Sequence, residues 1–170
     1  MIRAILHADR NWGIGRQNAL MFSLPGDMKF FRTATSGKTV VMGGNTLRSF
    51  PGGKPLKNRT NIVLSRTQVR DDCVIVRSLE ELFSELKKRG QEDIFIIGGG
   101  EIYRALLPYC AEVLVTKVDA DGEADTFFPD LDRDPSFALE SDSGPVEDNG
   151  YEIRFLCYKN LRVRTLEQSG

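Results

Sequence analysis

Short apolar segments of strand length alternate with helical patterns through the first two thirds of the chain. The apolar segments cover residues 2–8, 39–43, 60–65, 73–76, 93–97 and 111–118. The helical patterns cover residues 25–35, 45–50, 78–90 and 101–107. This alternation predicts right-handed crossovers and a mostly parallel sheet that helices cover on both faces. Alternating segments at residues 137–141 and 151–158 predict an antiparallel pair of strands that extends the sheet at one edge.

The length of the chain fits one domain. Of its 170 residues, 41% are hydrophobic and 28% are charged, so it has apolar material for a core and is unlike disordered chains. No internal repeat and no linker divides it. We therefore expect a single α/β domain over residues 1–160, built on a central, mostly parallel, twisted sheet. A polar C-terminal tail with no assigned role follows over residues 161–170.

The ionisable and sulfur-containing residues exclude several classes of function. Lys and Arg number 23 against 24 Asp and Glu, a net charge of −1 that gives no overall field for a polyanion, so no nucleic-acid partner is expected. The three cysteines are widely spaced and form no CxxC motif, which argues against a disulfide framework and a zinc ribbon. His7 is the only histidine, so HExxH chemistry and multi-histidine metal sites are excluded, and no metal is expected.

The sequence shows no signal for export or membrane insertion. Residues 1–9 contain only a short apolar stretch, interrupted at Arg3 and ended by Asp9, without the apolar core of a signal peptide. No apolar run approaches the roughly 18–20 residues that a membrane span needs. We therefore expect a cytoplasmic protein with no membrane partner.

Glycine follows two of the predicted strands at the point where a helix begins. Segments 40–46 and 96–102 both run from an apolar strand through glycine into a helical pattern, and a third strand ends at Ser65 and Arg66. Glycine lets a ligand approach the backbone, and the N–H groups at a helix start bind anions. Each junction alone is also explained by a tight turn, but the three together favour a dinucleotide at the carboxyl ends of the strands. The G-x-G-x-x-G fingerprint is absent, which disfavours a standard Rossmann dehydrogenase.

Asp27 is the candidate catalytic acid. It follows Pro25 in the first turn of the predicted helix, where most acids simply complement the helix dipole. Two features favour a catalytic role instead. Phe31 lies four residues further on the same helix face, and the residues at 20–22 and 24 are all apolar. A carboxylate among such side chains is poorly solvated, which suits it to handle protons near neutral pH.

Six motifs follow one another along the chain in a familiar order. They are 9–15 (DRNWGIG), 24–32 (LPGDMKFFR), 40–46 (VVMGGNT), 59–65 (RTNIVLS), 97–103 (IGGGEIY) and 125–129 (DTFFP). Each motif is weak by itself, but together they resemble the bacterial dihydrofolate reductase family, and the resemblance covers residues 1–160. It implies the family's α/β fold, reduction of 7,8-dihydrofolate to 5,6,7,8-tetrahydrofolate with NADPH as cofactor, and a monomer.

The resemblance implies roles for residues at the substrate end. Asp27 matches the family's single acid, which holds the 2-amino and N3 edge of the pterin and promotes protonation at N5, so that C6 accepts the hydride. Arg59 matches the arginine that pairs with the glutamate tail of folate. The other positions that match substrate-binding residues are Leu6, Ala8, Phe22, Phe31, Lys54 and Thr116.

The resemblance also implies a set of cofactor-binding residues. Ile14, Asn18 and Ala19 fall in a mobile loop that closes over the nicotinamide, and the Gly98–Gly99 peptide bond is expected to be cis. The full set is Ala8, Ile14, Gly15, Asn18, Ala19, Gly44, Asn45, Thr46, Ser65, Arg66, Arg77, Ile97, Gly98, Gly99, Gly100, Glu101, Ile102 and Tyr103.

Three positions depart from the family pattern. Residues 21–22 are Met-Phe instead of the common Pro-Trp, which removes an indole N–H from the pocket. Gly44 replaces an arginine near the 2′-phosphate, so the preference for NADPH rests on Arg66 and Arg77. His7 replaces an alanine beside the pocket. A histidine without an evident partner is weak evidence for catalysis, so we interpret His7 as a structural strand residue.

Two other functions remain open at this point. A related reductase of the same fold acts on a pyrimidine intermediate of riboflavin synthesis, but Asp27 after Leu-Pro and Arg59 for a glutamate tail favour the folate enzyme. A dinucleotide-binding module without catalysis would be favoured by loss of the pocket acid, yet Asp27 is present.

Overall fold

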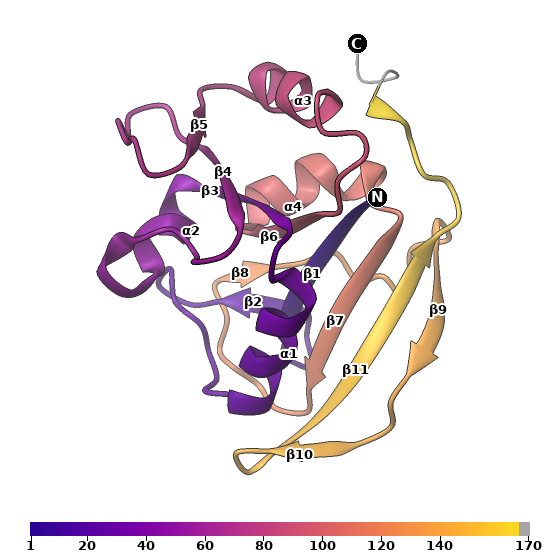
Figure 1. Cartoon of the computed structure of the whole chain (residues 1–170). Coiled ribbons are helices and arrows are strands. Elements are labelled where there is room, and N and C mark those ends of the chain that lie inside the picture. Colours follow the sequence, from indigo (N-terminus) through magenta and orange to yellow (C-terminus); the bar gives the residue numbers. More distant parts are fainter. Residues whose placement is uncertain (167–170) are drawn as a thin grey trace.

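Nine strands form the main sheet of the computed structural model, which describes residues 1–166 (Figure 1). The strand order is β10-β11-β7-β1-β6-β3-β4-β5, and β9 pairs with β11 outside this path. The strand bounds are β1 Ile2–Ala8, β3 Thr39–Gly43, β4 Thr60–Leu64, β5 Val74–Val76, β6 Ile94–Gly98, β7 Glu112–Val118, β9 Phe137–Asp142, β10 Val146–Asp148 and β11 Tyr151–Asn160.

The strand pairing is parallel in the centre of the sheet and antiparallel at one edge. β1 pairs in parallel with β6 and β7, β3 pairs in parallel with β4 and β6, and β4 pairs in parallel with β5. β11 runs antiparallel to β7, β9 and β10. The predicted mostly parallel sheet with an antiparallel C-terminal pair is therefore confirmed, with β9 and β11 as that pair.

Helices cover both faces of the sheet, as predicted. Their bounds are α1 Pro25–Thr35, α2 Gly44–Ser49, α3 Leu79–Lys87 and α4 Gly100–Leu106, with short 3-10 turns at Pro51–Gly53 and Leu107–Tyr109. Successive residues of β3 show how the layers form. Val41 belongs to the larger core cluster, with residues of α3 and α4, whereas Val40 and Met42 belong to a smaller cluster with residues of α1 and α2. The sheet is thus the middle of three layers.

Helix α3 begins as its sequence predicts. The hydroxyl oxygen of Ser78 accepts a hydrogen bond from the backbone N–H of Glu81, and the Glu81 carboxylate accepts one from the N–H of Arg77. The first bond satisfies an N–H group that a helix start otherwise leaves without a partner, and the second holds the residue before the cap. Leu82 and Leu86, one turn apart, are fully buried, which agrees with the helical period of the apolar residues.

The sequence does not predict three of the strands. β2 (Gly13–Gly15) and β8 (Thr126–Phe127) form a separate two-stranded sheet, and β10 has only three residues. Segments this short show no alternation of apolar and polar residues, so they give no strand signal. The β2–β8 pair nevertheless matters, because it joins the loop after β1 to the segment before residue 127.

The C-terminal end of the described chain lies against the domain. β11 ends at Asn160, whose side-chain amide donates to the carbonyl of Cys110. Within the predicted tail, the N–H of Arg164 donates to the carbonyl of Pro108 at 2.9 Å. The last part of that tail, residues 167–170, lies outside the described residues. Among residues 1–166, no helix has the length and apolar character to cross a bilayer.

Candidate active site

A cleft of about 1210 Å³ opens at the carboxyl ends of the central strands. It is lined by residues that follow β3, β4 and β6, by the end of β1, by the inner side of α1 and by the loop between β1 and α1. Open α/β sheets bind ligands at this position, and the cleft lies where the glycines at the strand ends predict a ligand site.

The structure brings most of the predicted site residues together in this cleft. Those that line it are Leu6, Ile14, Gly15, Asn18, Ala19, Phe22, Asp27, Phe31, Gly44, Asn45, Thr46, Arg59, Ser65, Arg66, Arg77, Ile97, Gly98, Gly99, Gly100, Glu101, Ile102 and Tyr103. The Gly98–Gly99 peptide bond is cis, as expected.

Three predicted site residues do not line the cleft. Ala8, at the last position of β1, is fully buried in the larger core cluster and does not reach the cleft. Lys54 is exposed after the 3-10 turn that follows α2, outside the cleft. Thr116 lies behind the cleft wall on β7, only 2% exposed, and reaches the site through a hydrogen bond to Asp27.

Asp27 projects from the first turn of α1 into one end of the cleft, with 14% of its side chain exposed. The Thr116 hydroxyl donates to its Oδ1 at 2.6 Å, and Nδ1 of His7 lies 3.6 Å from its Oδ2. Phe22 and Phe31 line the cleft nearby, so the predicted apolar surroundings are present on that side. The carboxylate is nevertheless more polar in its contacts than the sequence predicts.

Asp148 binds the start of α1 in place of a local cap. Its Oδ1 accepts from the N–H of Gly26 at 3.1 Å and its Oδ2 from the N–H of Asp27 at 3.0 Å. The residue before the helix, Leu24, has no side chain that can cap it. Since Asp148 already satisfies these N–H groups, the carboxylate of Asp27 is not needed to cap the helix and can face the cleft.

Arg59 lies on the cleft wall beyond α1. Its Nε donates to the Thr35 hydroxyl at 3.1 Å, its Nη1 donates to the carbonyl of Lys57 at 2.9 Å, and its guanidinium lies 6.0 Å from the ring centre of Phe31. Burial first, and then the nearby charge of Arg32, lower the pKa of Arg59. Two guanidinium groups on one wall suit a carboxylate ligand.

Backbone N–H groups and one unpaired arginine gather at the other end of the cleft. Helices α2 and α4 both begin at glycine, after β3 and β6, with no side-chain cap. Within residues 1–166 the guanidinium of Arg66 has no hydrogen bond or ion pair. Arg77 differs, because its Nη1 donates to the carbonyls of Ser65 and Gln68 and so shapes the turn that presents Arg66.

Gln68 occupies the space in front of Gly44. Its Nε2 donates to the carbonyl of Gly44 at 3.2 Å, and a Cβ built on Gly44 would lie 2.6 Å from that nitrogen. A larger side chain at position 44 therefore requires Gln68 to move. Glycine at this position leaves room for the side chain of Gln68 from the 65–68 turn, whereas an arginine would not.

The loop over the cleft is tied down at both of its sides. The Asp125 carboxylate accepts from the N–H of Gln17 at 2.8 Å, and the N–H of Asp125 donates to the carbonyl of Gly15. On the other side, the amide of Asn18 donates to the carbonyl of Asn45 at the start of α2. The loop thus lies closed over the end of the cleft that the glycine-bearing helices form.

A family model described as dihydrofolate reductase matches residues 1–160. The chain belongs to the dihydrofolate reductase family. It is 35% identical over 162 residues to the dihydrofolate reductase of Bacillus subtilis, an alignment that covers 94% of each chain. It is 38% identical over 146 residues to that of Haemophilus influenzae, covering 84% of this chain and 88% of the relative.

A solved structure of the same family has the same fold. Dihydrofolate reductase from Enterococcus faecalis, complexed with NADP(H) and a ligand named RAB-propyl, superposes with a TM-score of 0.83. It is 30% identical, and the match covers 94% of this chain and 96% of that one. The family expected from the six motifs, and with it the class of an oxidoreductase, is confirmed.

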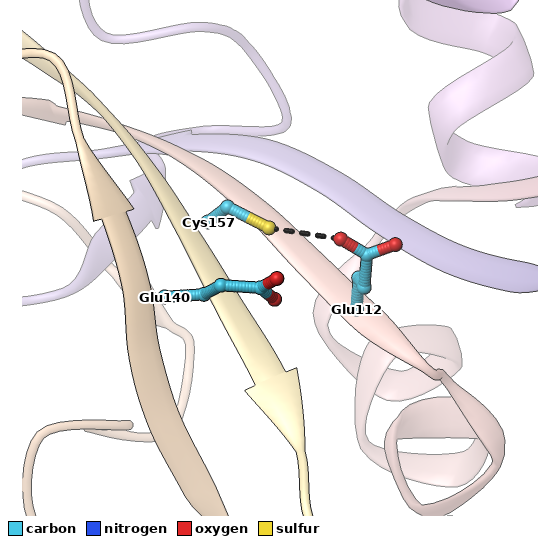
Figure 2. A group of neighbouring side chains, drawn as sticks. All are labelled: Glu112, Glu140 and Cys157. Atoms are coloured by element: carbon cyan, nitrogen blue, oxygen red, sulfur yellow. Dashed lines mark hydrogen bonds between the residues drawn. The ribbon is translucent and has the colours of Figure 1, made fainter.

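One cluster of potential metal ligands lies outside the cleft in the described part of the chain. Figure 2 shows Glu112 of β7, Glu140 of β9 and Cys157 of β11 pointing toward one another. The Cys157 thiol donates to Glu112 Oε2 at 3.0 Å, and Nε of Arg3 donates to Glu112 Oε1 at 3.3 Å. Burial, and then the hydrogen bond and charge of Glu112, raise the pKa of Cys157 to about 12. The thiol therefore stays protonated, and the cluster is explained by its own contacts.

Sequence reasoning misses two side chains that bind or face Asp27. Asp148 lies 121 residues away along the chain, and nothing in its local sequence distinguishes it from other acids in turns. His7 has no evident partner in the sequence, whereas the structure places it against Asp27. The register of β1 and β7, which sets His7 opposite Thr116, is the signal that identifies both neighbours of the carboxylate.

Proposed function

We propose that the protein reduces 7,8-dihydrofolate to 5,6,7,8-tetrahydrofolate with NADPH, acting in the cytoplasm as a monomer. The observation that carries the proposal is the arrangement of the cleft in a chain of this family. Asp27 lies at one end, and two helix starts with free N–H groups lie at the other. A substrate with a ring edge that donates hydrogen bonds fits the first end, and a ligand with two phosphates fits the second.

The residues at the second end fit NADPH. The N–H groups at the starts of α2 and α4 have no side-chain caps, and Arg66 supplies a cation without a partner among residues 1–166. Asn45 and Thr46 at the start of α2 and Ser65 before the 65–68 turn line the same wall. When bound, NADPH supplies the hydride. The chain's own part is to hold the phosphates by these groups and to close the 14–19 loop over that end.

Asp27 has the geometry for the proton side of the reaction. One carboxylate accepts two hydrogens from a ring edge when both of its oxygens face the ligand. Thr116 donates to Oδ1, and each oxygen retains lone pairs for the 2-amino and N3 hydrogens of the pterin. Held in this way, the ring takes a proton at N5, and C6 becomes electrophilic enough to accept the hydride.

Arg59 has the geometry for the glutamate tail of folate. Its hydrogen bonds to Thr35 and Lys57 use Nε and Nη1, which leaves Nη2 and its N–H groups for a carboxylate. Phe31, between Asp27 and Arg59 along the cleft wall, offers an apolar surface to the part of the substrate between the ring and the tail. An acid on one side of Phe31 and an arginine on the other thus favour a long substrate with an acidic end.

The test follows absorbance as NADPH is oxidised, with and without dihydrofolate, and repeats the assay with NADH and with Asp27→Asn. We expect oxidation that requires dihydrofolate, with NADPH preferred. The asparagine variant should bind NADPH as the parent does but lose turnover at pH 7 by about 100-fold or more, with partial recovery at lower pH. Parental turnover in Asp27→Asn at pH 7 would contradict the role of this acid. Tight binding of NADPH without any dihydrofolate turnover would support the non-catalytic module instead.

A further inference from the structure

His7 faces the proposed acid from a neighbouring element. It is on β1, in register with Thr116 on β7, so the two side chains lie next to each other and both reach Asp27 on α1. Its side chain is 6% exposed, and its Nδ1 lies 3.6 Å from Asp27 Oδ2. Its Nε2 is buried and has no hydrogen-bond partner among the described residues. Since His7 lines the cleft, this imidazole belongs to the wall that contacts a ligand.

The environment of the ring favours one arrangement of its proton. A neutral imidazole has one N–H donor and one acceptor nitrogen. With the proton on Nδ1, the donor faces the carboxylate of Asp27, and only an acceptor remains without a partner at Nε2. With the proton on Nε2, a lone pair of Nδ1 would face the carboxylate oxygen, and a buried donor would lack a partner. The first arrangement is the more favourable one, because an N–H donor instead of a lone pair then faces the carboxylate.

Other charged groups around the pair do not compete for it. The Asp148 carboxylate of β10 is bonded to the N–H groups of Gly26 and Asp27, not to the imidazole. β7 presents the neutral hydroxyl of Thr116, and the segment before α1 presents Phe22, whose ring centre lies 6.0 Å from that of His7. In the part of the chain that the structure describes, Asp27 is the only carboxylate within ion-pair distance of His7.

We propose that His7 is a positioning residue for Asp27. Its Nδ1–H and the Thr116 hydroxyl approach different oxygens of the carboxylate, so together they fix its rotation about the side chain and direct it into the cleft. The separation of 3.6 Å is longer than a hydrogen bond and is expected to shorten when a ligand occupies the cleft, as such contacts often do. The proposal rests on the proposed role of Asp27 and replaces the interpretation of His7 as a purely structural residue.

Three substitutions of His7 distinguish the contribution of Nδ1 from that of Nε2. The side-chain amide of asparagine places an N–H near the position of Nδ1, whereas that of glutamine places it near the position of Nε2, and alanine removes both. We expect His7→Ala and His7→Gln to lower kcat for dihydrofolate about tenfold, with KM for NADPH unchanged, and His7→Asn to restore most of it. Turnover by the glutamine variant equal to or above that of the asparagine variant would overturn the proposal.

A spectroscopic test does not depend on turnover. Because His7 is the only histidine, the imidazole 15N resonances of the labelled protein come from a single residue. We expect the neutral ring to show Nδ1 protonated and Nε2 unprotonated in the parent, and to change to the Nε2-protonated form in Asp27→Ala. An Nε2-protonated ring in the parent would show that His7 does not donate to Asp27. This result would stand whether or not the protein reduces dihydrofolate.

A matched control distinguishes a role of His7 in positioning Asp27 from a role in the stability of the fold. Thr39 begins β3 at the end of the sheet away from the cleft, and its buried hydroxyl donates to Glu92, so Thr39→Ala loses a buried hydrogen bond without touching the site. We expect Thr39→Ala to lower the unfolding temperature and leave kcat unchanged. If the kcat values of the three His7 variants instead follow their unfolding temperatures, the role of His7 is structural and the proposal is wrong.

Discussion

Two arginines in the cleft, Arg66 and Arg77, differ in the number of hydrogen bonds that they make within the protein. Arg66 has no partner within residues 1–166, whereas Arg77 donates to the carbonyls of Ser65 and Gln68 in the turn that contains Arg66. A free guanidinium is available to a phosphate, but a guanidinium bonded to the backbone mainly holds a shape. The two residues are thus expected to contribute to cofactor binding in different ways.

Arg66→Ala tests this difference. We expect it to raise KM for NADPH about tenfold while changing KM for NADH little, because only NADPH has the 2′-phosphate that a guanidinium can bind. Arg77→Ala serves as the comparison and should weaken both cofactors, since it loosens the turn that includes Ser65 and Gln68. Steady-state kinetics with each cofactor measures both effects. Equal losses for the two cofactors in Arg66→Ala would remove its assignment to the 2′-phosphate.

The three cysteines are predicted to react slowly in the folded protein. Burial raises the pKa of Cys110 to about 12, burial and Glu112 raise that of Cys157 to about 12, and burial, followed by the charge of Asp72, raises that of Cys73. At pH 8 a thiol of pKa about 12 is ionised in roughly one molecule in ten thousand. A colorimetric thiol reagent should therefore modify all three thiols rapidly in the denatured protein. In the native protein, each of the three should react slowly. Fast modification of Cys157 in the native protein would contradict its bond to Glu112.

At the scale of elements, the loop between β1 and α1 is held in place by Asp125, a residue more than 100 positions later in the sequence. The N–H of Gln17 is the main reason that the pKa of Asp125 lies below its ordinary value. A lowered pKa means that the folded protein favours the carboxylate. The contribution of this contact is therefore fully present above about pH 4 and is lost as the pH falls through the lowered pKa.

Asp125→Asn is expected to loosen the loop at neutral pH. We expect kcat to fall about fivefold and KM for NADPH to rise, because closure over the cofactor end becomes less populated. Asp121→Asn is the control in the same segment, since within the described residues Asp121 accepts from the N–H of Glu123 and from no group of the loop. Kinetics at pH 7 compares the two variants. Equal activities would show that the loop does not need Asp125.

The start of α1 is held by the hairpin between β10 and β11. Asp148→Ala removes the acceptor of two N–H groups, and we expect it to cost about 1 kcal/mol of stability and to lower kcat, because Asp27 lies in the turn that loosens. Glu147→Ala, in the same hairpin, removes a bond to Gly150 and should leave kcat unchanged. Thermal unfolding and kinetics measure the two effects. A stable, fully active Asp148→Ala protein would contradict the cap.

The strands that the sequence predicts are those in which apolar residues dominate. β3 and β6 are mostly runs of buried apolar side chains, and β1 is a mostly apolar strand that also contains Arg3 and His7. The parallel pairing of these strands follows from helices that cross between them. β2 and β8 are too short for any pattern. The contacts of Asp27 are a different case, because Thr116, His7 and Asp148 come from three elements that only the folded sheet brings together. Motifs identify which residues belong to the site, but they do not show which neighbours hold the acid.

At the scale of the whole molecule, the charge of the cleft has the opposite sign to the net charge of the chain. The chain carries a net charge of −1. Five arginines line the cleft against two acids, Asp27 and Glu101, and those arginines are Arg32, Arg48, Arg59, Arg66 and Arg77. The cleft is therefore a positive region on a protein that is otherwise acidic, which favours ligands with anionic groups at both ends.

Because Asp148 caps the start of α1, the site is completed only after the C-terminal part of the chain has been synthesised. Ribosomes synthesise chains from the N-terminus, so Asp27 and Arg59 leave the ribosome long before the strand that follows Asp148. β11 then adds to the sheet beside β7, the strand that contributes Thr116. A nascent chain that lacks these last strands contains the residues that line the cleft, together with Thr116, but the start of α1 that carries Asp27 lacks its cap. Competence to bind the substrate ring is thus expected to arise at the end of synthesis, in one late step.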